Sequence, residues 1–371
     1  MKYDLSVAVI ISMMILISCQ ESADRSQDAP RPFEASHYDQ EYWISYFESS
    51  DNGLWENDTL KHITYKREGH LSTSSGEEVS VFRPYSMCVY DGNIYITDAG
   101  VYQIVALDEG YSELWRAGDQ GEGPGHFTMM TSLAATKDFV LALNSGLSRV
   151  EVFDRETGDY SHSFQFMGAE DIITIDDSTV AIGSRMNSDG DIHIVDVHGD
   201  ILQSFGVTET LEYHNIPRSD LMRLAYDSNG RICIFNRYEG RLAIYDIDSE
   251  ECIYRGSRSY PSEPRGPLSL ISENGEERQV YFPIGGNVFL GYENTINVVL
   301  CNVMQDRSFI SDPEYLDYAP VTLIDRYNWE GSYLDTYCLP DSCISHVTML
   351  SEDMMIGRNY AEGAIKVFSV E

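Results

Sequence analysis

The sequence predicts an all-β fold, a six-bladed β-propeller whose blades are four-stranded antiparallel sheets. Three observations predict it. From residue 56 onward, short apolar strands are separated by turns rich in Asp, Gly and Asn, a pattern typical of sandwiches, barrels and propellers. A unit of three strands joined by polar turns recurs along the chain, as in repeat architectures. Helical periodicity is weak, with one short helix expected near Ser219–Leu224.

The clearest copy of the unit runs over Ser86–Asp98 and continues over Tyr102–Asp108. Its first two strands are joined by an Asp-Gly pair, a strong hairpin signal. The further copies are expected at Leu133–Asp154, Ile172–Asp196, Leu224–Asp246, Gln279–Leu300 and Ser345–Ser369. Outer fourth strands are expected at Glu113–Arg116, Ser161–Phe166 and Ile201–Phe205. Insertions are expected near Tyr260–Glu277 and near Asp306–Tyr333.

One strand-like segment, Leu60–Tyr65, precedes the first complete unit and has no partner of its own. We expect it to add the outer strand to the last blade and so to join the two ends of the chain. A ring closed in this way leaves no exposed sheet edge, which would otherwise favour aggregation.

A glycine-rich link, Gly118–Phe127, follows the first unit. A phosphate-binding loop would lead into a helix, whereas Phe127 leads into another strand, so the link is expected to turn the chain from one blade to the next. The link resembles the Gly-x-Gly-x-Gly-Pro-Gly-x-Phe segment of bacterial six-bladed propeller lipoproteins, relatives of the NHL and TolB-type propellers. Each unit likewise resembles the inner three strands of an NHL-type blade. The resemblance implies a six-bladed ring over residues 51–371.

The N-terminus predicts export. An apolar run over Leu5–Ile17 follows Lys2; it is too short to cross a bilayer and is typical of a secretory signal. Its end, Leu16-Ile17-Ser18-Cys19, resembles the bacterial lipobox. We therefore predict a signal peptide over residues 1–18 and a lipid on Cys19, which would anchor the chain in a membrane. The alternative is an ordinary secretory signal cut near a cysteine.

Residues 19–50 are predicted to form a flexible tether, because they are polar, contain proline and include few aliphatic residues. Gln20 follows the cysteine, and it differs from the Asp that resembles an inner-membrane retention signal. The outer membrane is therefore the expected location, and the anchor could lie in either of its leaflets.

The formal net charge is -35, which excludes nucleic acid as a partner because phosphates would be repelled. Only 5 of the 25 basic residues are Lys. The acids occur in every segment of the sequence, which favours adaptation to salt, where ions screen their repulsion. The alternative is an acidic face for a cationic partner.

Cysteine usage agrees with an oxidising compartment. Six cysteines besides Cys19 permit up to three disulfides. Cys338 and Cys343 flank a Pro-Asp turn and are the candidate pair. The remaining cysteines lie mostly on apolar strands, where a free buried thiol is an equally good interpretation.

Propellers bind ligands at the funnel formed by their inner strands, so residues that enter those strands are the candidate ligand-binding residues. Arg83 and Tyr85 precede the first inner strand, Arg218 and Arg223 precede the fourth, and His346 lies in the sixth. Arginine can hold an anion through two parallel hydrogen bonds. Ordinary ion pairs with neighbouring acids are the alternative.

No cofactor is predicted, with Ca²⁺ and Zn²⁺ as alternatives. Asn187–Asp191 places oxygen ligands at alternate positions, as a Ca²⁺ loop does, although Asp-Gly is also a common turn. The amidating lyases resemble this chain in their blades and use histidines on zinc. The corresponding candidates would be His193, His214 and His346.

Two functions follow. The first is a membrane-anchored binding or scaffold propeller for an envelope protein or glycan. Its support is the anchor, the tether and an aromatic content of 12%. The alternative is an exported metal-dependent enzyme of the lactonase or amidating-lyase kind. Fold alone does not decide between them.

Overall fold

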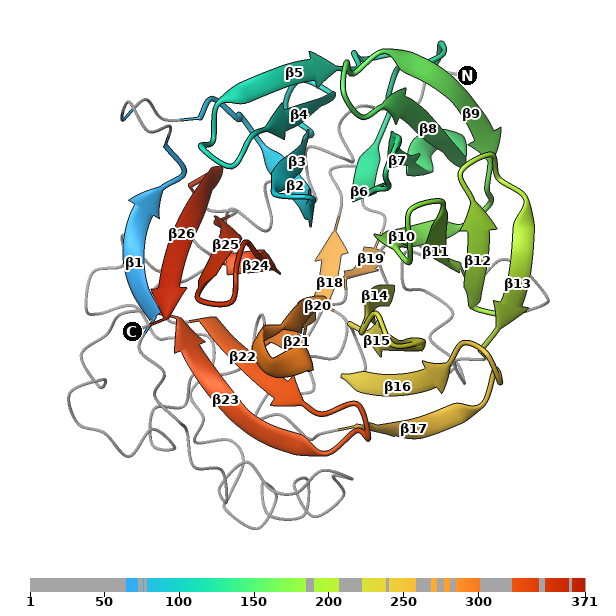
Figure 1. Cartoon of the computed structure of the whole chain (residues 1–371), viewed down its shortest axis with the longest axis vertical. Coiled ribbons are helices and arrows are strands. Elements are labelled where there is room, and N and C mark those ends of the chain that lie inside the picture. The colour runs from blue at the N-terminus through green and yellow to red at the C-terminus, as the bar shows by residue number, and fades with distance from the viewer. Residues whose placement is uncertain are drawn as a thin grey trace.

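In the computed structural model, six four-stranded antiparallel sheets are arranged as blades around a central axis (Figure 1). This confirms the predicted all-β, six-bladed propeller. The structure describes residues 65–72, 76, 79–184, 190–206, 222–237, 240–257, 268–271, 277–280, 285–300, 322–339, 344–359 and 362–370. Within these ranges, no helix is long and apolar enough to span a membrane.

Blades one to three follow the chain in simple order, with each strand pairing to the next. Blade one consists of β2 (Pro84–Tyr90), β3 (Asn93–Asp98), β4 (Gln103–Leu107) and β5 (Glu113–Ala117). Blade two consists of β6 (Met130–Ala135), β7 (Phe139–Asn144), β8 (Arg149–Asp154) and β9 (Tyr160–Gln165). Blade three consists of β10 (Ala169–Thr174), β11 (Thr179–Ser184), β12 (Ile192–Asp196) and β13 (Ile201–Phe205). The outer strands β5, β9 and β13 lie where the sequence predicts them.

Blades four to six complete the set. Blade four consists of β14 (Met222–Tyr226), β15 (Arg231–Asn236), β16 (Arg241–Asp246) and β17 (Cys252–Ser257). Blade five consists of β20 (Gly285–Gly291), β21 (Thr295–Leu300), β22 (Thr322–Tyr327) and β23 (Tyr333–Leu339). Blade six contains β24 (Ile344–Met349), β25 (Met354–Asn359) and β26 (Ala364–Val370), and β1 (Tyr65–His70) lies next to β26.

The fifth blade differs from the prediction. Its second strand is β21, which the sequence pattern placed third, and β22 lies inside the segment predicted as an insertion. Residues 301–321 separate β21 from β22 and interrupt the regular spacing on which the prediction depended. Gln279 belongs instead to β19 (Glu277–Val280), which pairs with β18 (Leu268–Ile271) in a separate two-stranded sheet.

The prediction of a helix near Ser219–Leu224 is wrong for residues 222–224, the part that the structure describes. Residues 222–224 belong to β14 and pair with β15 from Met222 opposite Asn236 onward. Met222 and Leu224 are both buried, so packing against neighbouring blades determines the local structure more than helix propensity does.

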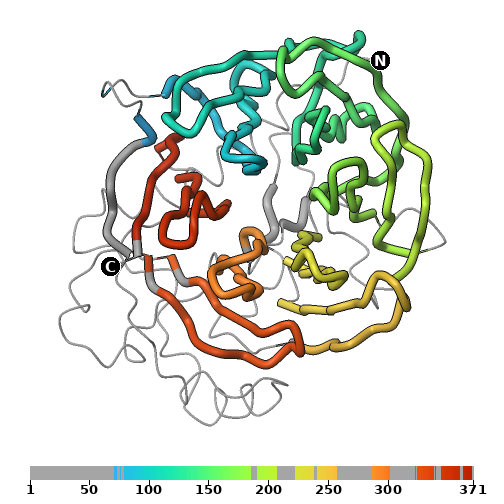
Figure 2. Tube along the Cα trace, viewed as in Figure 1, coloured from blue at the N-terminus to red at the C-terminus, as the bar shows by residue number. Residues whose placement is uncertain are grey.

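β1 pairs antiparallel with β26, with Tyr65 opposite Val370 and His70 opposite Lys366. Tyr65 is the one residue that β1 shares with the strand expected at Leu60–Tyr65, and residues 60–64 lie outside the described ranges. The trace in Figure 2 shows the first and last blades as neighbours in the ring.

Apolar side chains fill the spaces between blades. The described residues form six buried apolar clusters, one at each junction between neighbouring blades. The second strands β3, β7, β11 and β15 share one burial pattern, in which every residue after the first is buried. Both faces of a blade pack against a neighbour, so these strands are apolar at successive positions, as in sheets covered on both sides.

The glycine-rich link joins β5 to β6, as predicted, and is held by blade two. The amide of Gly125 donates to Glu151 Oε2 (3.2 Å), and Asn144 Nδ2 donates to the carbonyl of His126 (2.9 Å). Arg149 pairs with Glu151 and donates from Nη2 to the carbonyl of Gly123 (2.9 Å). The link is therefore a structural connection between two blades.

In each of the first four blades an Asp ends or directly follows the third strand, and its carboxylate caps the following turn. Asp154 Oδ1, for example, accepts hydrogen bonds from the amides of Glu156 (3.0 Å) and Thr157 (2.9 Å). Asn328 has the same role in blade five. Side chains of Asp and Asn favour such turns because they bond backbone a few residues on.

Asp154→Ala should therefore lower the Tm by about 2–4 °C, as loss of roughly 1 kcal/mol of hydrogen bonding would. Glu156→Ala removes the same charge from the same turn and should leave the Tm nearly unchanged. Hydrogen bonds, first that from the amide of Thr157, hold the pKa of Asp154 below its ordinary value. Its stabilisation is thus present above that ordinary pKa and is lost as the pH falls through the lowered one. Melting curves at pH 7 and pH 3 check this; an equal difference at both pH values would contradict it.

Candidate functional site

The inner strands of all six blades line an axial channel of about 190 Å³. Each inner strand contributes one polar side chain near its start. These residues, called the axial ring here, are Ser86, Ser132, Asp171, Arg223, Asn287 and His346. We call the end of the channel at which the inner strands begin the mouth, and the side of the disc that carries it the mouth face.

Part of the axial ring connects the blades. Asp171 in blade three accepts a hydrogen bond from Ser132 Oγ of blade two (2.6 Å) and another from the amide of Leu224 in blade four (2.8 Å). Asn287 of blade five donates to the carbonyl of Val347 in blade six (2.9 Å) and accepts from its amide (3.0 Å). These side chains therefore stabilise the ring of blades around the channel.

A buried group of charges lies at the junction of blades three and four. Glu170, Asp171 and Arg223 are each at most 4% exposed. Glu170 Oε2 accepts from the amide of Met222 (2.8 Å), and Arg223 Nη1 donates to the carbonyl of Met222 (2.7 Å). Burial raises the pKa of Asp171, and the positive charge of Arg223 opposes that shift. The predicted ligand-binding residue Arg223 thus lines the channel and also holds this junction.

The sixth and first blades form a cationic and aromatic group at the mouth. The guanidinium of Arg358 lies over the ring of Tyr85, 4.9 Å from its centroid. His346 and Arg358 are direct partners across β24 and β25, and all three side chains are half-buried. Such stacking of arginine on an aromatic ring is favourable. The structure thus brings two predicted residues, Tyr85 and His346, next to the same arginine.

Arg358 was missed in the sequence. The sequence feature that could have identified it is its position near the end of the second strand of the last unit, because the second strand of a blade ends at the mouth. Arg83 is exposed, and its amide donates to Asp98 Oδ1 (2.9 Å). Arg218 lies outside the described residues.

The metal alternatives involve His193, His214, His346 and the segment Asn187–Asp191. His193 is buried in blade three, bonded to Ser204 Oγ (2.8 Å) and packed edge-on against Phe166, whereas His346 lines the channel from blade six. His214 and Asn187–Asp189 lie outside the described residues. Among the residues that are described, no group of three or more His, Cys, Asp or Glu side chains could hold a metal ion.

The cysteines fall into two groups, those whose state the structure describes and those for which the prediction stands. Cys343 lies outside the described residues, so its disulfide with Cys338 stays a prediction, and so does the lipid on Cys19. Cys88 and Cys233 are free, and burial raises the pKa of both thiols. Cys88 lines the channel but has the raised pKa of an unreactive thiol.

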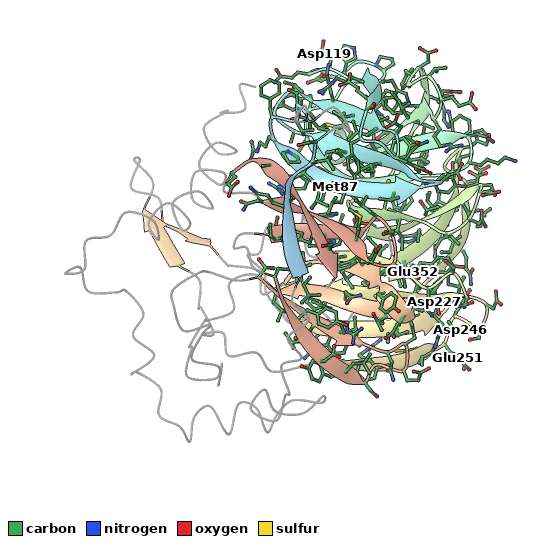
Figure 3. All side chains as sticks on the ribbon, turned by 60° about the vertical axis from the view of Figure 1, so that its left-hand side comes forward. Met87, Asp119, Asp227, Asp246, Glu251 and Glu352 are labelled. Carbon is green, nitrogen blue, oxygen red and sulfur yellow. The ribbon has the colours of Figure 1, made fainter. Side chains whose placement is uncertain are left out.

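The side of the disc opposite the mouth face is strongly acidic. It carries the turns between the first and second strands and between the third and fourth strands of each blade, and we call it the turn face. Figure 3 shows Asp227, Asp246, Glu251 and Glu352 gathered on this side. In the described turns, the basic residues are Lys137 and Arg155, whereas each blade contributes carboxylates.

Among the described residues, this grouping differs from the even spread of acids along the sequence. Turns of one kind recur along the whole sequence, so their acids appear spread in the sequence although they gather on one face. Salt adaptation and an acidic face for a cationic partner both stay predictions.

Comparisons with known proteins identify the fold. No protein-family model matches the chain, and no curated protein matches it. A protein of Bacteroides fragilis NCTC 9343 that is described as exported has a TM-score of 0.52 and 12% identity, over 84% of this chain and 96% of that one. The WD40 repeats of RRP9 have a TM-score of 0.51 and 9% identity, over 82% and 100% of the two chains. The chain is thus a six-bladed β-propeller that resembles bacterial exported propellers and WD40 proteins.

Proposed function

We propose that this chain is an exported, lipid-anchored propeller that binds an envelope protein or a glycan at the mouth of its channel. The observation that carries the proposal is the group of Tyr85, His346 and Arg358 at the mouth, on a protein with a formal net charge of -35. Arginine and tyrosine dominate binding hot spots because they combine a large flat surface with hydrogen-bond donors. A rigid ring that holds them in place reduces the entropy cost of binding.

The test is binding to a purified soluble propeller, with a glycan array and cross-linking to envelope proteins as the two sources of ligand. Tyr85→Ala and Arg358→Ala should each weaken binding of the ligand that is found by roughly tenfold or more. A stoichiometric Zn²⁺ or Ca²⁺ that is lost when axial-ring residues are replaced would contradict the proposal and favour the metal-dependent enzyme.

The anchor is supported by the apolar run and the lipobox-like end at Cys19. Cys19→Ser should move the protein to the soluble fraction or leave the precursor uncut, because both cleavage and membrane attachment depend on the lipid. Fractionation and the mass of the mature N-terminal peptide check this. A Cys19→Ser protein that is processed normally and stays in the membrane would contradict the lipoprotein assignment.

We further propose that β1 closes the ring by completing blade six. The pairing of β1 with β26 supports this, and so does the apolar cluster at the junction of blades six and one, which includes Leu71 beside Ile365 and Val367. Deleting residues 65–70 should accelerate hydrogen exchange at the β26 amides, since their partners would be lost. Unchanged exchange in β26 would show that another segment pairs with it.

A further inference from the structure

Three consecutive blades display a large apolar side chain at the same place on the mouth face. Phe82, Met129 and Met167 lie one or two residues before the inner strands β2, β6 and β10, and they are 69%, 42% and 58% exposed. We call these three residues the apolar arc. Its recurrence at one blade position distinguishes it from scattered exposed apolar residues, which are normal on protein surfaces.

The backbone of each arc residue is fixed by the last residue of the second strand of its own blade. The amide of Phe82 donates to Asp98 Oδ2 (2.8 Å), the amide of Met129 donates to Asn144 Oδ1 (3.4 Å), and Ser184 Oγ donates to the carbonyl of Met167 (2.8 Å). Asp98, Asn144 and Ser184 are fully buried. The backbone of the arc is therefore held by a rigid scaffold, so little backbone entropy would be lost when a partner covers it.

The charge around the arc indicates the kind of partner. Arg83 follows Phe82 directly and is exposed, and Arg358 lies nearby over Tyr85. The acidic turn face would repel a segment with negative charge. Asp119 of the link is an acid of another part of the molecule, and it lies at the periphery of the disc (Figure 3). A guanidinium can donate two parallel hydrogen bonds to a carboxylate.

We propose that the apolar arc and Arg83 form the docking surface for a peptide segment of a partner protein, one that carries large apolar side chains next to a carboxylate. Phenylalanine and methionine are enriched in such interfaces, and methionine adapts its shape to different apolar groups. This inference rests on the proposed binding function and specifies a protein ligand.

The test uses a phage-displayed library of random dodecapeptides selected on the propeller. The enriched peptides should combine large apolar residues with a neighbouring Asp or Glu. Binding of a synthetic copy should weaken about tenfold or more in Phe82→Ser and in Met167→Ser. Leu202→Ser is the matched control, because Leu202 is 59% exposed on the outer strand of the same blade as Met167; it should leave binding unchanged.

The charge is tested by replacing the peptide acid with its amide. This change should weaken binding to the wild-type propeller about tenfold but leave binding to Arg83→Gln unchanged, because the pair is then already lost. If the enriched peptides are rich in Lys or Arg and bind the Phe82→Ser variant normally, the proposed docking surface is wrong. The protein would then still bind a partner, but through the acidic turn face. If no peptide is enriched, the proposal of a peptide ligand is overturned. The ligand would then be a glycan, which the glycan array would identify.

Discussion

Asp171→Ala is expected to destabilise the propeller by about 3–5 kcal/mol, because it removes a buried carboxylate that accepts hydrogen bonds from two other blades and interacts with the positive charge of Arg223. The carboxylate of Asp171 joins three blades through Ser132 Oγ and the amide of Leu224. Its removal also leaves these two donors without their acceptor, which adds a desolvation cost. Denaturant unfolding followed by tryptophan fluorescence measures the difference.

The matched control is Asp200→Ala. Asp200 is exposed in a turn of the same blade, so its loss should change the stability by less than about 0.5 kcal/mol. Equal effects of the two substitutions would show that the axial ring does not hold the blades together.

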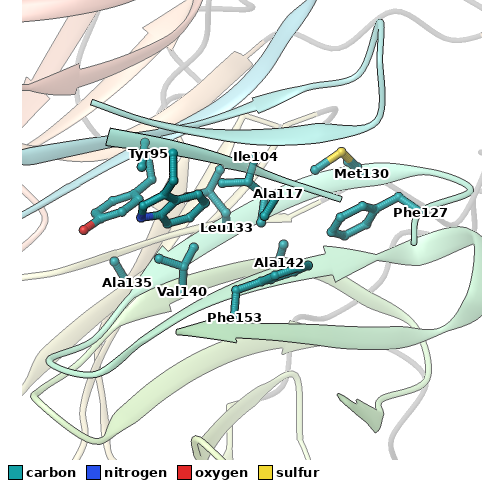
Figure 4. Packing of buried hydrophobic residues seen from close by; sticks show 12 residues of the cluster. Tyr95, Ile104, Ala117, Phe127, Met130, Leu133, Ala135, Val140, Ala142 and Phe153 are labelled. Atoms are coloured by element: carbon teal, nitrogen blue, oxygen red, sulfur yellow. The ribbon is translucent and has the colours of Figure 1, made fainter. Parts of the chain in front are cut away.

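Phe127→Ala is expected to cost about 3–5 kcal/mol, the range for removing a buried phenylalanine. Phe127 ends the glycine-rich link, is fully buried and stacks on Phe153 with ring centroids 6.0 Å apart. Figure 4 shows it in the apolar cluster between blades one and two, beside Met130 and Ala142. The cavity would lie at a junction of two blades, where neither sheet can move without disturbing its other neighbour.

The comparison for Phe127 is Phe82→Ala, which removes the same side chain from a position that is 69% exposed. Thermal and denaturant unfolding should place this variant within about 0.5 kcal/mol of the wild-type protein. A Phe127→Ala protein of similar stability would contradict the assignment of the link to the core.

The link also shows why part of the fold is readable from the sequence. Gly118 has φ +97°, and a Cβ at that position would lie 2.7 Å from the ring of Phe127, so local chemistry requires glycine there. The Asp residues that end or directly follow the third strands are readable for the same reason, because each caps its own turn. Strand rhythm, turns and the link depend on neighbours in the sequence, and they were predicted where the spacing is regular.

Features that depend on distant residues could not be predicted in this way. The contact of Arg358 with Tyr85 joins the last blade to the first, and the contact of Asp171 with Leu224 joins two inner strands. The fifth blade was assigned incorrectly because residues 301–321 separate its second strand from its third. The acidic turn face became visible only when the ring placed turns from all blades on one side.

The central claim is that the mouth face of an anchored propeller binds its partner. Its most direct test places a photo-cross-linking amino acid at Met129, at Met167 or at Asp248 of the turn face, in the full chain expressed in its native envelope. We predict one and the same adduct from Met129 and Met167 and none from Asp248. An adduct from Asp248 alone would contradict the claim and assign binding to the acidic turn face.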